Sequence, residues 1–241
     1  MGEQQPESPA AQRSMTWTWV AAVVVLAIIV TGVVVGWRIA TRPDSPEPGV
    51  VVTPATTSPA TAGDCPEGPV EMSGTVTTGP EATWVLVGKM AAPTVEDAGP
   101  AVVDEDGYRH CYARTPVGAL VAAANLAAMG SEQSLSSRLA SDGLVPGALR
   151  DRLMASPQPS SSSSGGGQLR GFRMVSYDGN KTVVELGLQT NNGGYGSVMV
   201  ELVWHDGDWR YGVRGEGAAQ DLAVTYSWPP SLVGFILWAG V

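Results

Sequence analysis

An uncharged apolar stretch from Trp17 to Trp37 constrains this chain more than any other feature of its sequence. Its polar side chains are Thr18 and Thr31, and tryptophans stand at both of its ends. A helix rises about 1.5 Å per residue, so the stretch is long enough to cross the roughly 30 Å hydrocarbon core of a bilayer. Tryptophan rings favour the headgroup level on either side of that core. We therefore predict a transmembrane helix over residues 16–40.

A cleaved signal peptide is the competing interpretation of this stretch. Signal peptides carry an apolar run of about 7–15 residues that ends at a small-residue cleavage site. Here the run is longer, and no A-x-A site follows it, so an uncleaved anchor is favoured. Within the anchor, Gly32 and Gly36 form a G-x-x-x-G motif that would let two such helices pack closely. Glycine is common in membrane helices in any case, so self-association through this face stays a hypothesis.

The side of the membrane on which the C-terminal part lies is less simple to predict. Arg13 precedes the span, whereas Arg38 and Arg42 follow it, so the positive-inside rule mildly favours a cytoplasmic C-terminal part. The Pro/Thr-rich segment beyond the span is instead typical of exported stalks. The two cysteines also suit one disulfide in an oxidising compartment. We expect a single-pass cell-membrane protein with its N-terminus in the cytoplasm and its C-terminal domain outside.

Composition divides the 241 residues into a tail, the anchor, a linker and one folded domain. The expected parts are a disordered cytoplasmic tail at 1–15, the transmembrane segment at 16–40, a Pro/Thr-rich linker at 41–64 and an extracytoplasmic α+β domain at 65–241. Inside that domain, 65–114 should be an extended N-terminal part and the Ser/Gly-rich 156–168 a flexible loop. The formal net charge of −9 argues against direct binding of nucleic acid, which depends on lysine and arginine.

Cys65 and Cys111 could be joined, free or bound to a metal. A disulfide would close a loop of about 50 residues and stabilise the fold by up to about 4 kcal/mol in the chain-entropy account. A metal is conceivable because His110 adjoins Cys111, but no C-x-x-C and no second nearby histidine occur. We favour the disulfide over free thiols and expect no metal and no cofactor. The acidic run at 104–107 predicts a turn and not a calcium loop, because apolar residues stand at the first and last ligand positions.

Helices followed by strands are predicted for the rest of the domain. A helix should begin after the N-cap Thr115, with Pro116 in its first position, and end at Gly130. Its Asn125 suggests a solvated or capped amide, or else a ligand contact. Further expected elements are a strand at Thr83–Val87 and helices at Glu132–Ala140 and Pro146–Ala155. An antiparallel meander of four strands should follow, at Leu169–Tyr177, Thr182–Gln189, Tyr195–Trp204 and Trp209–Arg214. The apolar tail at Leu222–Val241 should pack on the domain or on a partner.

Little in the sequence indicates catalysis. His205 and Asp206 stand in a predicted hairpin turn, where polar residues are expected for turn formation alone. No nucleophile elbow, P-loop, dinucleotide fingerprint or zinc-protease motif occurs. We therefore expect that this protein is not an enzyme. Candidates for an interaction surface are Trp204, Trp209, Phe235 and Trp238, with core packing as the simpler explanation for the first two.

Several segments resemble a known group of proteins. They are Trp84-Val-Leu-Val, Gly99-Pro100, the run from Cys111 to Asn125, Gly171-Phe-Arg, Tyr177-Asp-Gly and the run from Val203 to Arg210. Together they resemble single-span membrane proteins of actinobacterial conjugative and integrative elements. Helices followed by a meander are also similar to the cone-shaped nuclear-transport-factor or cystatin-like fold, which forms the outer domain of bitopic assembly subunits in type IV secretion systems.

The resemblance implies a scaffold role. The expected function is a membrane-anchored, non-enzymatic assembly subunit of a conjugation or type IV-like secretion apparatus. Its partners would be other membrane and envelope subunits, further copies of itself, and the bilayer through one helix, without direct contact to nucleic acid. The alternative is a membrane-anchored accessory protein of lipid import or cell-wall maintenance. An enzyme that uses the pocket of the cone is a third hypothesis.

Overall fold

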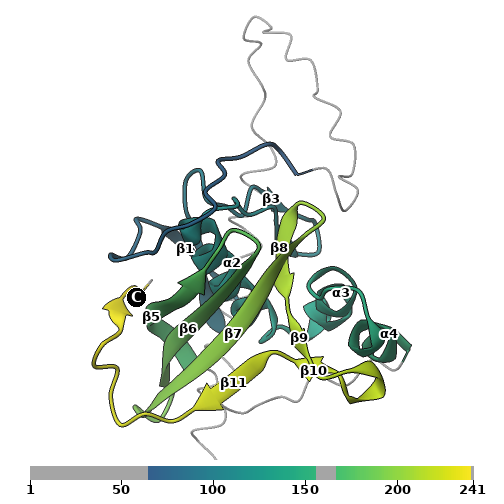
Figure 1. Cartoon of the computed structure of the whole chain (residues 1–241). Helices are drawn as coiled ribbons and strands as arrows, with labels where there is room; N and C mark the ends of the chain where they lie inside the picture. The colour runs from purple at the N-terminus through teal and green to yellow at the C-terminus, as the bar shows by residue number, and fades with distance from the viewer. Residues whose placement is uncertain (1–64, 156–166, 240–241) are drawn as a thin grey trace, which may run out of the picture. The chain divides into compact units, whose positions relative to one another are not determined.

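The computed structural model describes residues 65–155 and 167–239, which belong to the unit Ser58–Val241 (Figure 1). The predicted tail, transmembrane helix and linker, together with Gly32 and Gly36, lie outside the described residues. Among the described residues, no helix has both the length and the apolar character needed to cross a membrane.

Helix α2 (Pro116–Met129) begins and ends where the sequence predicts. The hydroxyl of the N-cap Thr115 accepts a hydrogen bond from the Gly118 amide at 3.0 Å, and Gly130 caps the other end. The helix is buried around nearly its whole circumference, because apolar side chains cover all its faces. Its alanines let strand β2 (Met90–Thr94) and three strands of the main sheet lie close to it.

The predicted antiparallel meander is present as four consecutive strands, although the fourth ends at Tyr211 and not at the predicted Arg214. They are β5 (Gly167–Tyr177), β6 (Lys181–Thr190), β7 (Tyr195–His205) and β8 (Asp208–Tyr211), each paired with the next. Strand β5 starts two residues earlier than the predicted loop at 156–168 allows. Gly167 and Gln168 therefore belong to the sheet, and residues 156–166 lie outside the described residues.

The C-terminal tail adds two further strands to this sheet. Strand β11 (Val224–Ser227) pairs with β7, and β12 (Ile236–Leu237) pairs with β5. Among the described residues the strand order is β11-β7-β6-β5-β12, with β8 also on β7. The tail thus runs from one edge of the sheet to the other (Figure 1).

The core lies between the sheet and α2. Period-two alternation turns one side chain in two toward the helix, and most of these inward positions are apolar and buried. They include Phe172, Val184, Leu186, Val200 and Leu202. Helices and antiparallel strands share this one core, so the domain belongs to the α+β class, as predicted.

Smaller elements complete the domain. Strand β1 (Thr83–Val87) has the predicted bounds and forms a hairpin with β2. The remaining elements are β3 (Val102–Val103), β4 (Arg109–His110), η1 (Gln133–Leu135), α3 (Ser136–Asp142), α4 (Ala148–Ala155), β9 (Val213–Arg214), η2 (Gly217–Ala219) and β10 (Asp221–Leu222). The short hairpin β3–β4 positions the disulfide described next.

Candidate functional site

Cys65 and Cys111 form a disulfide, which confirms the favoured sequence prediction. Their Cα atoms lie 5.2 Å apart, and 46 positions separate them in sequence. The bond ties the first described residue of the chain to the loop that leads from β4 into α2. Cys111 is buried and Cys65 is half-buried.

Asp208, at the start of β8, holds the backbone around Cys111. Its carboxylate accepts hydrogen bonds from the amides of Cys111 at 2.7 Å, Tyr112 at 3.0 Å and Trp209 at 2.9 Å. Cys111 adopts a φ of 66°, a left-handed conformation that these bonds stabilise. Burial raises the pKa of Asp208, against the opposing effect of the three amides. From the sequence, Asp208 is predicted only as part of a turn.

His110 lies between the disulfide and a carboxylate. Its Nδ1 is 3.3 Å from Cys111 Sγ, and its Nε2 is 3.2 Å from Asp104 Oδ1. Burial would raise the pKa of Asp104, but hydrogen bonds from His110 and Arg138 outweigh it and hold this pKa below its ordinary value. We call Cys65, Cys111, His110 and Asp104 the disulfide corner.

Arg138 of α3 ties the acidic turn to the helices. Its guanidinium pairs with Asp104 at 2.7 Å, Asp106 at 3.2 Å and Asp142 at 2.8 Å, and it stacks over the Tyr108 ring at 4.7 Å. The run at 104–107 forms the predicted turn, closed by a hydrogen bond from the Gly107 amide to the Asp104 carbonyl. The carboxylates of Asp104 and Asp106 in this turn therefore form ion pairs with an arginine of a helix that is distant in sequence.

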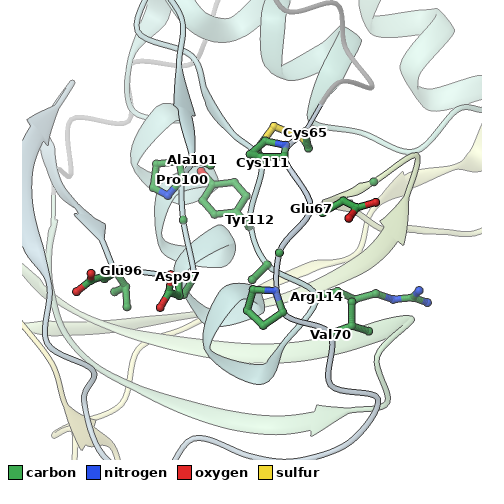
Figure 2. Close-up of a pocket in the computed structure, with 18 of the residues that line it drawn as sticks. Cys65, Glu67, Val70, Glu96, Asp97, Pro100, Ala101, Cys111, Tyr112 and Arg114 are labelled. Atoms are coloured by element: carbon green, nitrogen blue, oxygen red, sulfur yellow. A yellow bond between two sulfur atoms is a disulfide. The ribbon is translucent and has the colours of Figure 1, made fainter.

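A groove of about 760 Å³ opens beside the disulfide. Its walls are the segments 65–70 and 94–101, with 111–114 between them (Figure 2). Figure 2 shows Glu96 and Asp97 on one side, Glu67 on the other, and the Tyr112 ring between the two walls. Arg114 also lines the groove, but its guanidinium donates to Gly179 and Asn180. The groove therefore presents a mainly acidic rim.

Two of the four predicted surface aromatics lie in the core. Trp209 is 2% exposed and donates its indole N–H to the Ala113 carbonyl, because alternation along β8 turns it inward. Trp238 is 6% exposed, donates to the Pro80 carbonyl and packs edge-on against Trp84 and Phe172. These two residues are structural and do not form an exposed surface.

The other two predicted aromatics are half-buried under arginines. Arg114 stacks over Trp204 at 5.4 Å, and Arg173 stacks over Phe235 at 4.3 Å. The strongly exposed apolar side chains of the C-terminal tail are different residues, which the sequence analysis did not single out. They are Tyr226, Trp228, Val233 and Leu237, with exposed fractions of 73–87%.

The prediction of a solvated Asn125 was wrong, because its amide finds hydrogen-bond partners inside the core. It is completely buried, its Oδ1 accepts from Arg109 Nε at 2.6 Å, and its Nδ2 donates to the carbonyls of Pro93 and Val121. Arg109 also donates to Thr94 at 2.6 Å, and burial lowers the pKa of this guanidinium. The amide joins α2 to β2 and β4 inside the core.

His205 is the last residue of β7, at the predicted turn between β7 and β8. Its Nε2 is 3.1 Å from Asp206 Oδ2, and both side chains are substantially exposed. Backbone geometry accounts for this turn, since Asp206 and Gly207 both adopt positive φ. The two residues are therefore explained by their place at the end of a β-hairpin.

One comparison with known proteins identifies a family. A family described as "Domain of unknown function (DUF8175)" matches residues 44–236, which include nearly all of the described domain. No curated protein and no solved structure matches the chain. Because the match covers well over half of its length, the chain belongs to the DUF8175 family.

Proposed function

We propose that this protein is a membrane-anchored, non-enzymatic assembly subunit of a conjugation or type IV-like secretion apparatus, with its folded domain outside the cell membrane. In this proposal the domain corresponds to the cone-shaped, nuclear-transport-factor-like outer domain of such subunits. The packing of α2 against an antiparallel meander is compatible with that assignment. The observation that carries the proposal is the exposed edge of the main sheet at β11.

The edge at β11 combines a strand whose outer side meets the Arg214 guanidinium, which donates to the Val224 carbonyl, with two exposed aromatic side chains. Tyr226 is paired in register with Val198, which faces the core, and Trp228 follows two residues later. Both aromatics therefore project from the core-facing side of the sheet, yet they are 73% and 76% exposed. No described segment pairs with the outer side of β11.

Such an edge is a typical protein-binding surface. An unpaired strand offers backbone donors and acceptors to another chain, and exposed apolar edges promote association. Tyrosine and tryptophan dominate the binding energy of many interfaces. We therefore assign the edge to contacts with another subunit of the apparatus.

Crosslinking in native membranes tests this proposal. A photoreactive residue at Trp228 of the full chain should capture envelope subunits of the apparatus, and the double substitution Tyr226→Ser with Trp228→Ser should abolish their association. Leu86→Ser is the matched control, because Leu86 is 73% exposed on the separate hairpin β1–β2. Recovery of the monomer alone, or an equal effect of the control, would overturn the proposal.

The alternative is a membrane-anchored accessory protein of lipid import or cell-wall maintenance. The groove beside the disulfide is the observation that favours it, since about 760 Å³ lies within the usual range for small-ligand sites. In the same crosslinking experiment, capture of lipid-transport components in place of transfer subunits would establish this alternative.

A further inference from the structure

We propose that the disulfide corner is a redox-gated metal site. When oxidised it holds the Cys65–Cys111 disulfide, and when reduced it binds one thiophilic divalent cation of the zinc class. The ligands are the two cysteine sulfurs and His110 Nδ1, and Asp104 orients the histidine. This inference is independent of the proposed assembly function.

The three ligand atoms already lie together. Cys65 Sγ, Cys111 Sγ and His110 Nδ1 are all within 4.8 Å of one another, and Nδ1 is 3.3 Å from Cys111 Sγ. In a tetrahedral zinc site with Zn–S near 2.3 Å and Zn–N near 2.0 Å, neighbouring ligand atoms are about 3.5 Å apart. Once the S–S bond is broken, a small separation of the two sulfurs would make room for the ion.

The contact between His110 and Asp104 favours the tautomer that a metal requires. With the ring proton on Nε2, that nitrogen donates to Asp104 Oδ1 at 3.2 Å and leaves a lone pair on Nδ1. The lone pair then faces a disulfide sulfur, which carries no proton, so nothing bridges these two atoms. A carboxylate behind the far ring nitrogen is the usual outer shell of a metal-bound histidine.

The surroundings also favour a cation. Arg138 is paired with three carboxylates, those of Asp104, Asp106 and Asp142. These four groups together carry a net negative charge. The disulfide lines the acidic groove, which gives a reductant and an ion access to the sulfurs (Figure 2).

Electrons and protons are balanced in the conversion of the oxidised form to the reduced form. A dithiol reductant attacks the disulfide, passes through a mixed disulfide and leaves as its own cyclic disulfide, so that two electrons and two protons arrive at the two cysteine sulfurs. Binding of the cation then releases both thiol protons and forms two metal–thiolate bonds. Two sulfurs and one nitrogen leave the fourth tetrahedral position open to water.

Cobalt titration of the full chain in detergent tests the proposal, with cobalt(II) chloride as the probe. After anaerobic reduction and removal of the reductant, the protein should bind one Co²⁺ and develop a thiolate-to-cobalt charge-transfer band. The oxidised protein should not. Cys65→Ser should weaken this band because it removes one thiolate, and His110→Asn and Asp104→Asn should each weaken the affinity, the latter about 10- to 100-fold. His205→Asn is the matched control, since it changes the other histidine of the chain.

Two outcomes would overturn the inference. The first is the absence of a stoichiometric cobalt–thiolate band in the reduced protein. The second is a reduced His110→Asn variant that binds as tightly as the unsubstituted chain. If reduction unfolds the domain, Zn²⁺ should restore the far-UV circular dichroism spectrum, because a bound ion stabilises the folded form. Failure of Zn²⁺ to restore it would also reject the site.

Discussion

Replacing Asn125 by leucine should strongly destabilise the domain. The substitution keeps the number and branching of the side-chain heavy atoms, in a somewhat larger side chain, but removes both functions of the buried amide. Arg109 Nε loses an acceptor at 2.6 Å, and the Pro93 carbonyl loses a donor at 2.8 Å. The Val121 carbonyl keeps its place in the hydrogen bonding of α2.

The expected loss of unfolding free energy is about 3 kcal/mol. A hydrogen bond to a charged group contributes about 1.5–3 kcal/mol, and a neutral one contributes about 1 kcal/mol. The loss falls mainly on Arg109, which is 5% exposed and has no carboxylate partner among the described residues. The remaining described side-chain acceptor of this guanidinium is Thr94.

A double-mutant cycle measures the part of this loss that comes from the pair. Arg109→Met should also destabilise, because it leaves the Asn125 oxygen without its donor. With both substitutions present, apolar groups face each other, so the combined loss should fall at least about 1 kcal/mol short of the sum of the single losses. Urea unfolding followed by circular dichroism gives the three values. Additive losses would refute the argument, and so would a loss below about 1 kcal/mol for Asn125→Leu.

Three further predictions concern other parts of the domain. Removing the disulfide by Cys65→Ser with Cys111→Ser should lower the unfolding free energy by about 4 kcal/mol, since the bond spans 46 positions, and a loss below about 1 kcal/mol in urea unfolding would contradict this. Gly187→Ala should loosen the C-terminal tail and raise the rate of its amide hydrogen exchange, because a Cβ at this position would lie 2.9 Å from side-chain atoms of Leu232 and Phe235. Gly68→Ala is the control and should leave the exchange rate unchanged, because its Cβ would lie 4.0 Å from the nearest atom. Because the pKa of Asp104 is lowered in the folded protein, its carboxylate stabilises the fold at pH values above its ordinary pKa of about 3.9. This stabilisation is lost as the pH falls through the lower pKa of the folded state. Asp104→Asn should therefore make the unfolding free energy depend less on pH at acid pH.

Elements with local signals could be predicted from the sequence. The start of α2 follows from a threonine cap and a proline in the first turn, and these depend only on neighbouring residues. The meander follows from alternation between turn residues, so β6 and β7 were located to within one residue. The pairing of Cys65 with Cys111 was favoured because the chain has no other cysteine.

Features that depend on distant contacts were missed. Asp208 contacts the Cys111 amide across 97 positions, and a turn containing His205-Asp206-Gly207-Asp208 carries no sign of that role. Arg138 meets Asp104 across 34 positions. For Asn125 one signal was available, since a single amide on an otherwise apolar helix must find internal partners once every face of that helix is buried.

The part played by Asp208 links the fold to the proposed metal site. Its contacts to Cys111 and Tyr112 are made through backbone amides, so they do not depend on the oxidation of the sulfur. The position of Cys111 next to His110 should therefore survive reduction, and the main freedom gained would belong to Cys65, the less buried cysteine. A ligand pair that stays fixed while the third ligand moves loses less entropy when the ion binds than three free ligands would. The same fixed pair should also favour correct re-formation of the disulfide, so one carboxylate would support both forms of the corner.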